Sequence, residues 1–288
     1  MSTLAFVGLG AIGLPMASVL AASGHTVIGV DPMPAARERA ADAGITAVDS
    51  IRAVAATADG AEVATVLVMV ATGDQLDTLV TEAGAAVRGQ TWIVMSTVGP
   101  ESVTAAARRL TAAGATVLDA PVTGGVARAK TGDLVLFAAG SAADLAHNDA
   151  LLRTLGTPRT VGDTVGAGQS IKVINQHLCS VHIVAAAEAL DLARRLGLDP
   201  EGVLDLVQDG AAGSWMLSDR GPRMLLGTDA PVTSAISIFV KDSGLVAEVA
   251  AEAAASVPLL DVARGKYLDA VERGLAARDD SRVIETYR

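Results

Sequence analysis

Three polar side chains stand in the sequence at a spacing that could bring them to one ligand. Lys172, Asn175 and Gln176 occupy positions i, i+3 and i+4. Residues at this spacing share one face of an α-helix, so an amine and two amides could act on the same small molecule. Near a helix N-terminus the macrodipole disfavours a positive charge, and we expect this to lower the pKa of Lys172 towards neutrality. Lys172 is therefore the candidate general acid/base, although a lone helical lysine is more often a solvated surface charge.

The element that must carry these side chains is one long helix, expected from Gly166 to Gly197. Ser170 is its candidate N-cap, Gly197 suits a left-handed cap after its last turn, and Asp199-Pro200 begins the next helix. At ~1.5 Å per residue the helix is about 40 Å long, enough to join two domains. The apolar residues that recur at helical spacing, and that we expect to form its buried row, are Ile171, Ile174, Leu178, Val181 and Ala185.

The composition limits the class of the protein and its partners. A length of 288 residues suggests about two domains, and 51% hydrophobic residues indicate a globular protein. A net charge of -10 would repel a nucleic-acid backbone, and an aromatic content of 2% argues against base-stacking surfaces. The one cysteine has no partner for an internal disulfide, and no signal peptide precedes the first strand, so we expect a cytoplasmic protein. The longest apolar run, residues 63–71, is too short for a membrane span.

The start of the chain has the pattern of a dinucleotide-binding turn. An apolar strand at residues 4–7 leads into a glycine turn and then a helix at residues 14–22, and a second strand at residues 25–30 ends at Asp31. In such a turn the glycines allow a tight bend, the approach of a pyrophosphate and close helix packing, and the acid binds the ribose hydroxyls. We therefore expect NAD as cofactor, in preference to NADP. The turn residues are Gly8, Leu9, Gly10, Ala11, Ile12 and Gly13.

Strands and alanine-rich helices alternate through the first half of the chain and predict an α/β fold, a Rossmann-type doubly wound parallel sheet. Further strands are expected at residues 64–70, 92–95, 116–119 and 134–138. Ligands of such sheets lie outside the carboxyl ends of the strands, where polar tips occur at residues 71–73, 96–100 and 119–125. Thr123, Gly124 and Gly125 offer a hydroxyl and two backbone donors that could hold a carboxylate, although the same residues also suit an ordinary glycine turn.

After Gly162 only helical patterns follow, which predicts two domains, residues 1–163 and 164–288, the second of them all-α. Its helices are expected at residues 200–209, 214–226, 238–255, 259–274 and 281–287, with a polar loop over residues 228–237. Lys241 stands beside Asp242 and could turn inward, although a surface ion pair is the simpler interpretation. No spacing of His, Cys, Asp or Glu suggests a metal site, and no G-x-S-x-G motif suggests a hydrolytic serine.

Taken together, these motifs resemble the β-hydroxyacid dehydrogenase family over essentially the whole chain. The resemblance rests on GLGAIGLPMA at residues 8–17, STVGP at 96–100, DAPVTGG at 119–125, GAGQSIKVINQ at 166–176 and FVKD at 239–242. It implies an NAD-dependent oxidoreductase that needs no metal, with Lys172 as the catalytic acid/base. The substrate residues that it implies are Ser96, Thr123, Gly124, Gly125, Asn175 and Gln176. The cofactor residues that it implies are those of the glycine turn with Asp31, Thr97 and Lys241.

Within this family, three segments resemble the L-threonate dehydrogenases: residues 175–190, 213–217 and 234–242. They predict a small anionic hydroxy acid as substrate, and specifically the oxidation of L-threonate or a close aldonate to its 2-oxo acid. Gln176, with Ser214 and Ser237, could bind hydroxyls that 3-hydroxyisobutyrate lacks. Thr123 and Gln176 stand where the family more often has serine and asparagine, and the segment SDRGPR at residues 218–223 departs from that subgroup and could reshape the pocket rim.

Other functions remain open on the sequence. Within the family these are 3-hydroxyisobutyrate dehydrogenase and 2-hydroxy-3-oxopropionate (tartronate semialdehyde) reductase. Outside it are a non-catalytic NAD(H)-binding protein and an imine reductase with the same two-domain plan, and Lys172 argues against both of these. The long helix and the alanine-rich second domain predict a homodimer or homotetramer.

Overall fold

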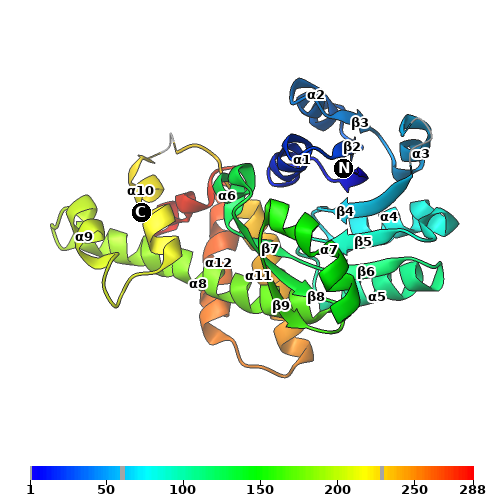
Figure 1. Ribbon diagram of the computed structural model, residues 1–288. Helices are drawn as coiled ribbons and strands as arrows, with labels where there is room; N and C mark the ends of the chain where they lie inside the picture. Colours follow the sequence, from blue (N-terminus) through cyan, green and yellow to red (C-terminus); the bar gives the residue numbers. More distant parts are fainter. Residues whose placement is uncertain (1, 59–61, 228–229) are drawn as a thin grey trace. The chain divides into compact units, whose positions relative to one another are not determined.

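The structure is a computed structural model that describes residues 2–58, 62–227 and 230–288 (Figure 1). The chain packs as two compact units, Met1–Lys172 and Val173–Arg288, and the division falls inside the long helix α8, Ala167–Arg195. The domain boundary expected after residue 163 stays a prediction. The loop expected over residues 228–237 begins at residues outside the described ones.

Unit 1 is built on one sheet, which has nine strands within the described residues. The strands are β1 Thr3–Val7, β2 Thr26–Val30, β3 Thr46–Val48, β4 Val63–Val68, β5 Thr91–Val94, β6 Thr116–Asp119, β7 Val122–Thr123, β8 Leu134–Ala139 and β9 Gly156–Gly162. Their order is β3-β2-β1-β4-β5-β6-β8-β7, with β9 paired to β8. The pairs from β3 to β6 are parallel, as predicted, whereas β8 runs antiparallel to β6 and β7. The predicted Rossmann-type fold is confirmed.

Helices cover both faces of this sheet because side chains alternate along its buried strands. Ala5 and Val7 of β1 point into one apolar core, and Leu4 and Phe6 point into the other. The first core is closed by α3 Val54–Thr57, α4 Gly73–Ala83 and α5 Pro100–Ala112. The second is closed by α1 Gly13–Ala22, α2 Pro34–Asp42, α6 Gly125–Thr131 and α7 Ala142–Leu155. The sheet is therefore buried on both sides, which explains its nearly continuous apolar strands.

Unit 2 is helical, as predicted. Besides its part of α8 it contains α9 Pro200–Val207, α10 Trp215–Leu225, α11 Ile236–Glu252, α12 Pro258–Glu272 and the 3-10 helix η4 Asp280–Tyr287. Its core is organised around Tyr267, whose ring stacks on Phe239 at 5.4 Å and whose hydroxyl donates to the Ser180 carbonyl at 2.9 Å. The last segment, for which a helix was expected at residues 281–287, is a 3-10 helix.

The two ends of α8 differ in how well local sequence predicted them. At the C-terminal end Gly197 has φ +75°, and the Leu198 N–H donates to the Ala193 carbonyl, so the left-handed cap is confirmed. Asp199 caps α9 through its side chain, also as expected. At the N-terminal end the prediction of Ser170 as cap was wrong, because α8 already begins at Ala167 and the Ser170 hydroxyl donates back to the Gly166 carbonyl at 2.9 Å.

The predicted buried row of α8 was also wrong. Ile171, Ile174 and Leu178 are 40%, 61% and 49% exposed. The row that is buried instead contains Val173, Ser180, Ile183, Val184 and Ala187. α8 has apolar residues on more than one side, and periodicity alone cannot tell which side neighbouring helices will cover.

Candidate active site

The glycine turn after β1 fits a dinucleotide. A Cβ at Gly8 would lie 2.3 Å from the Met69 carbonyl oxygen, and one at Gly13 would lie 1.9 Å from the Gly8 carbonyl oxygen, so both positions require glycine. At Gly10, by contrast, a Cβ would meet no heavy atom within 4 Å. The turn is therefore packed tightly on the protein side and open at its second glycine, beside the start of α1, as pyrophosphate binding requires.

Asp31 stands directly after β2 and is bonded to this turn. Its Oδ2 accepts a hydrogen bond from the Leu9 N–H at 2.9 Å, and its Oδ1 accepts one from the Met33 N–H at 2.9 Å. Arg37 lies on α2 and reaches back to donate to the carbonyls of Asp31 and Pro32 at 2.8 Å. The carboxylate thus has the position in which an acid binds ribose hydroxyls, with an arginine next to it.

Ser96, which follows β5, is wholly buried and its hydroxyl is already bonded. It accepts from the Val70 N–H at 2.8 Å and donates to the Val68 carbonyl at 3.3 Å, so it joins the ends of β4 and β5. Thr97 beside it is half-buried. It stays a prediction that Ser96 contacts the substrate and that Thr97 contacts the cofactor.

The predicted carboxylate-binding turn lies between β7 and α6. Thr123 is the last residue of β7 and is half-buried, and Gly125 begins α6 and is exposed. Gly124 and Gly125 have φ of +134° and +71°, values that favour glycine. The turn therefore presents an accessible backbone beside a hydroxyl, although its role in substrate binding stays a prediction.

Lys172 lies in α8 and is only 6% exposed. Shortly before it in the helix is Gln169, which belongs to a buried polar cluster that the sequence did not predict. In this cluster Asp119 accepts hydrogen bonds from the first turn of α8, and the Gln169 side chain bonds to Asp119 and to Ser96. Burial raises the pKa of Asp119, while the donors of Gln169 and Gly166 oppose that rise. Both residues lie within motifs of the sequence, but no local spacing rule connects positions that are 50 residues apart.

The candidate residues of unit 2 form a chain of polar contacts. The Asn175 amide donates to Gln176 Oε1 at 2.8 Å, and the Gln176 amide donates to Asp242 Oδ2. Lys241 Nζ lies 2.7 Å from Asp242 Oδ1, so the expected ion pair is present, with the lysine side chain 31% exposed. The amide of Gln176 is thus bonded at both ends within unit 2. The roles of Asn175 and Gln176 in substrate binding, and of Lys241 in cofactor binding, stay predictions.

The arginines of the SDRGPR segment are internal to unit 2. Arg220 pairs with Asp280 at 2.9 Å and Arg223 pairs with Asp279 at 3.1 Å, and both aspartates are fully buried. Burial acts to raise the pKa of Asp279. The pKa is nevertheless lowered to about 2, because Asp279 accepts hydrogen bonds from Ser281 and Thr233 and pairs with the Arg223 guanidinium. These pairs tie α10 to η4 and so stabilise unit 2. An effect of this segment on the pocket rim stays a prediction.

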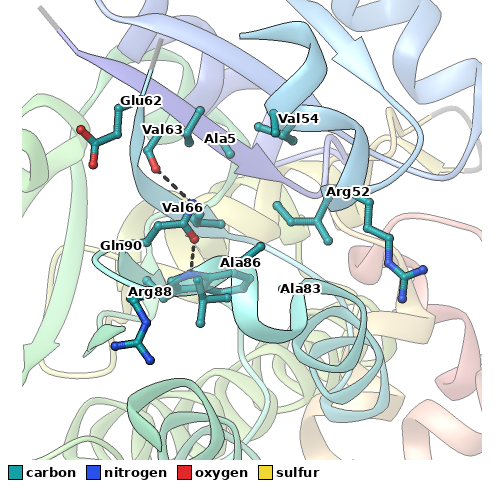
Figure 2. Close-up of a pocket in the computed structure, with 14 residues that line it drawn as sticks. Ala5, Arg52, Val54, Glu62, Val63, Val66, Ala83, Ala86, Arg88 and Gln90 are labelled. Atoms are coloured by element: carbon teal, nitrogen blue, oxygen red, sulfur yellow. Dashed lines mark hydrogen bonds between the residues drawn. The ribbon is translucent and has the colours of Figure 1, made fainter. Parts of the chain in front are cut away.

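Unit 1 contains a cavity of about 310 Å³ (Figure 2). Val63, Gln90 and Trp92 line it near the amino ends of β4 and β5. Asp31, Ser96 and Asp119 instead lie at or just after the carboxyl ends of their strands. The Gln90 amide donates to the Val63 carbonyl at 3.1 Å and accepts from Trp92 Nε1 at 3.0 Å, so it is already satisfied. None of the candidate site residues lines this cavity. It is therefore not the candidate active site.

Within the described ranges, no helix combines the length and the hydropathy that crossing a bilayer requires.

Both units of the chain match models of known protein families. Residues 3–170 match the family model described as the NAD binding domain of 6-phosphogluconate dehydrogenase. Residues 166–287 match the model described as the NAD-binding of NADP-dependent 3-hydroxyisobutyrate dehydrogenase. The chain is 36% identical to an L-threonate dehydrogenase of Cupriavidus necator, over 98% of this chain and 94% of that one. It is 32% identical to a 3-hydroxyisobutyrate dehydrogenase of Pseudomonas aeruginosa, over 100% and 99% of the two chains.

A solved structure agrees with these relatives. The crystal structure of 3-hydroxyisobutyrate dehydrogenase from Salmonella typhimurium superposes with a TM-score of 0.89 at 32% identity, covering 99% of this chain and 100% of that one. Both matched family models describe NAD-binding domains, and the glycine turn bonded to Asp31 agrees with them. The cofactor of this chain is therefore NAD or NADP. The chain is an NAD(P)-dependent oxidoreductase that belongs to the β-hydroxyacid dehydrogenase family.

Proposed function

We propose that this enzyme uses NAD to oxidise L-threonate, or a closely related aldonate, to its 2-oxo acid. The observation that carries the proposal is its 36% identity, over 98% of the chain, to a protein named L-threonate dehydrogenase. The buried Lys172, at the end of unit 1, supports the reaction type, because a positioned amine is a suitable acid/base for a hydroxyl proton.

In this proposal each group of residues has one task. Lys172, in its neutral form, accepts the proton of the substrate hydroxyl. When bound, NAD supplies a nicotinamide that takes the hydride from the substrate carbon. The turn at Thr123, Gly124 and Gly125 holds the substrate carboxylate with Asn175, and Asp31 selects the cofactor. Lys241, held by Asp242, acts on the cofactor side.

The choice of a sugar acid rests on the relatives and on polar side chains of unit 2. Ser214 accepts from the Leu217 N–H as the cap of α10, and its own hydroxyl proton stays available to a ligand. Gln176 would bind a hydroxyl only by sharing the amide that now bonds Asn175 and Asp242. A buried polar group left unpaired costs about 1–3 kcal/mol, so each hydroxyl missing from a substrate should lower kcat/KM by about ten- to a hundredfold.

A substrate panel tests this proposal. NADH formation is measured with L-threonate, D-erythronate, D-glycerate and 3-hydroxyisobutyrate at equal concentrations. We expect L-threonate or D-erythronate to be fastest and 3-hydroxyisobutyrate to be at least about tenfold slower, because it lacks the extra hydroxyls. If 3-hydroxyisobutyrate is fastest, the proposal is wrong and 3-hydroxyisobutyrate dehydrogenase, the name of relatives from Pseudomonas aeruginosa and Salmonella typhimurium, is the function to adopt.

We further propose that a second copy of the chain covers the exposed row of α8. Ile171, Ile174 and Leu178 follow the spacing of a packing stripe and are 40% to 61% exposed, a pattern more typical of an interface than of a free surface. Light scattering should give a mass of two or four chains, and Ile174→Glu should lower it. A monomeric wild type would refute the proposal. The cytoplasmic location stays a prediction.

A further inference from the structure

The first turn of α8 receives its cap from another element. Asp119, the last residue of β6, is wholly buried, and its Oδ2 accepts hydrogen bonds from the Gly166 N–H at 3.0 Å and the Gln169 N–H at 2.9 Å. The first N–H groups of a helix have no partner within the helix, and a carboxylate is a favourable partner at this end. Asp119 thus replaces the local serine cap that the sequence suggested.

Gln169 extends this contact to the chain after β5. Its Nε2 donates to the Ser96 carbonyl and to Asp119 Oδ1, both at 2.9 Å. Its Oε1 accepts from the N–H groups of Val98 at 3.0 Å and Gly99 at 3.1 Å. Two donor protons and two acceptor positions are all that a glutamine amide has, so the side chain is fully satisfied although it is wholly buried.

The same turn is packed directly on the sheet. A Cβ at Gly168 would lie 2.4 Å from the Phe137 carbonyl oxygen and 2.9 Å from Asp119 Oδ2. The helix start therefore has no space in which to move towards the sheet. Lys172 follows Gln169 by three residues in the same regular helix, so the position of its backbone depends on these contacts.

We propose that Asp119 and Gln169 are positioning residues for Lys172, because they hold the first turn of α8 against the carboxyl ends of β5 and β6. The inference rests on the proposed role of Lys172. A displacement of about 1 Å in a catalytic group can cost up to about a hundredfold in rate, so loosening this contact should lower kcat more than it changes KM or cofactor affinity.

The test uses three variants of the full chain. Asp119→Asn places an amide donor against the donors of Gln169, and Gln169→Glu places an acceptor against the Asp119 carboxylate and the Ser96 carbonyl. The double variant lets the new amide donate to the new carboxylate and so restores one link. We expect each single variant to lower kcat by about ten- to a hundredfold, to change the pH profile of kcat, and to leave the Kd for NADH within about threefold. The double variant should recover part of kcat.

Gln90→Glu is the matched control. Gln90 also joins two strands through both ends of its amide, but at the amino-end edge of the same sheet (Figure 2). The variant should lower the melting temperature while kcat and its pH profile stay as in the wild type. If it lowers kcat as much as Gln169→Glu, the effect is general destabilisation and the inference is wrong.

The remaining outcomes separate this inference from the proposed function. If Lys172→Ala is inactive while Gln169→Glu keeps the wild-type kcat and pH profile, the inference fails and the proposed function stands. If Lys172→Ala is fully active, both fail. If Asp119→Asn does not fold, Gln169→Glu and the double variant still decide, because recovery of kcat in the double variant requires the proposed link.

Discussion

The Asp31 carboxylate accepts a hydrogen bond from the Leu9 N–H at 2.9 Å, which joins the end of β2 to the glycine turn. We therefore expect two effects of this residue on cofactor binding, because it holds the turn and should place a negative charge where NADP carries its 2′-phosphate. We expect the wild type to prefer NAD. Asp31→Ala should lower kcat/KM with NAD, and so bring it closer to kcat/KM with NADP.

Arg37 provides the control for this prediction, because its guanidinium lies at the carbonyls of Asp31 and Pro32. In an Asp31→Ala background the two carbonyls still hold the guanidinium, but its positive charge is no longer offset by the Asp31 carboxylate. It can then attract the 2′-phosphate of NADP, so adding Arg37→Ala should reduce the gained NADP activity. Initial rates with both cofactors decide the question, and an NADP preference in the wild type would contradict it.

Gly10 allows cofactor affinity to be separated from stability. A Cβ at this position meets no heavy atom of the protein within 4 Å, so Gly10→Ala should leave the melting temperature nearly unchanged. The same methyl group would occupy the space needed by the pyrophosphate, and we expect the Kd for NADH to rise by about tenfold or more. Gly13→Ala should instead lower the melting temperature, because its Cβ would lie 1.9 Å from the Gly8 carbonyl oxygen. Fluorescence titration and thermal melts measure both effects.

Lys172→Ala should lower kcat by a factor of about 10²–10⁴, as expected for the loss of a general acid/base. NADH binding should be nearly intact, because Asp31 and the glycine turn are unchanged. Added methylamine should restore part of the rate, since a small amine can occupy the space left by the side chain. A variant that keeps more than half of the wild-type kcat would refute the role of Lys172.

Asp279 should make unit 2 sensitive to acid. Its pKa of about 2 in the folded chain lies below its ordinary value of 3.8, so the ionised form stabilises the fold above about pH 4. This contribution is lost as the pH falls from about 4 to about 2. The difference in unfolding free energy between wild type and Asp279→Asn should therefore shrink over that range.

Asp205→Asn is the control for this prediction, because Asp205 is an exposed aspartate of the same unit. Urea unfolding between pH 5 and pH 2 measures the three proteins. A constant difference between wild type and Asp279→Asn across that range would show that the Arg223 pair does not act through ionised Asp279.

The features that sequence alone determined are those set by neighbouring residues. The glycine turn from Gly8 to Gly13, the acid after β2, and the left-handed end of α8 at Gly197 depend on backbone conformations that a few adjacent residues impose. Strands buried on both faces need continuous apolar runs, so the parallel sheet and the change to helices after β9 were also predictable.

Tertiary structure decided the rest, because it depends on which distant segments meet. Asp119 caps α8 across 47 residues of sequence, which requires that β6 end beside the start of that helix. The exposure of Ile174 depends on which apolar side of α8 the other helices of unit 2 cover. The antiparallel direction of β8 depends on how this strand pairs with β7 after the intervening helix α6, and no alternation of apolar residues encodes that pairing. In each case a local pattern permits several contacts, and only the order and register of the packed elements select one of them.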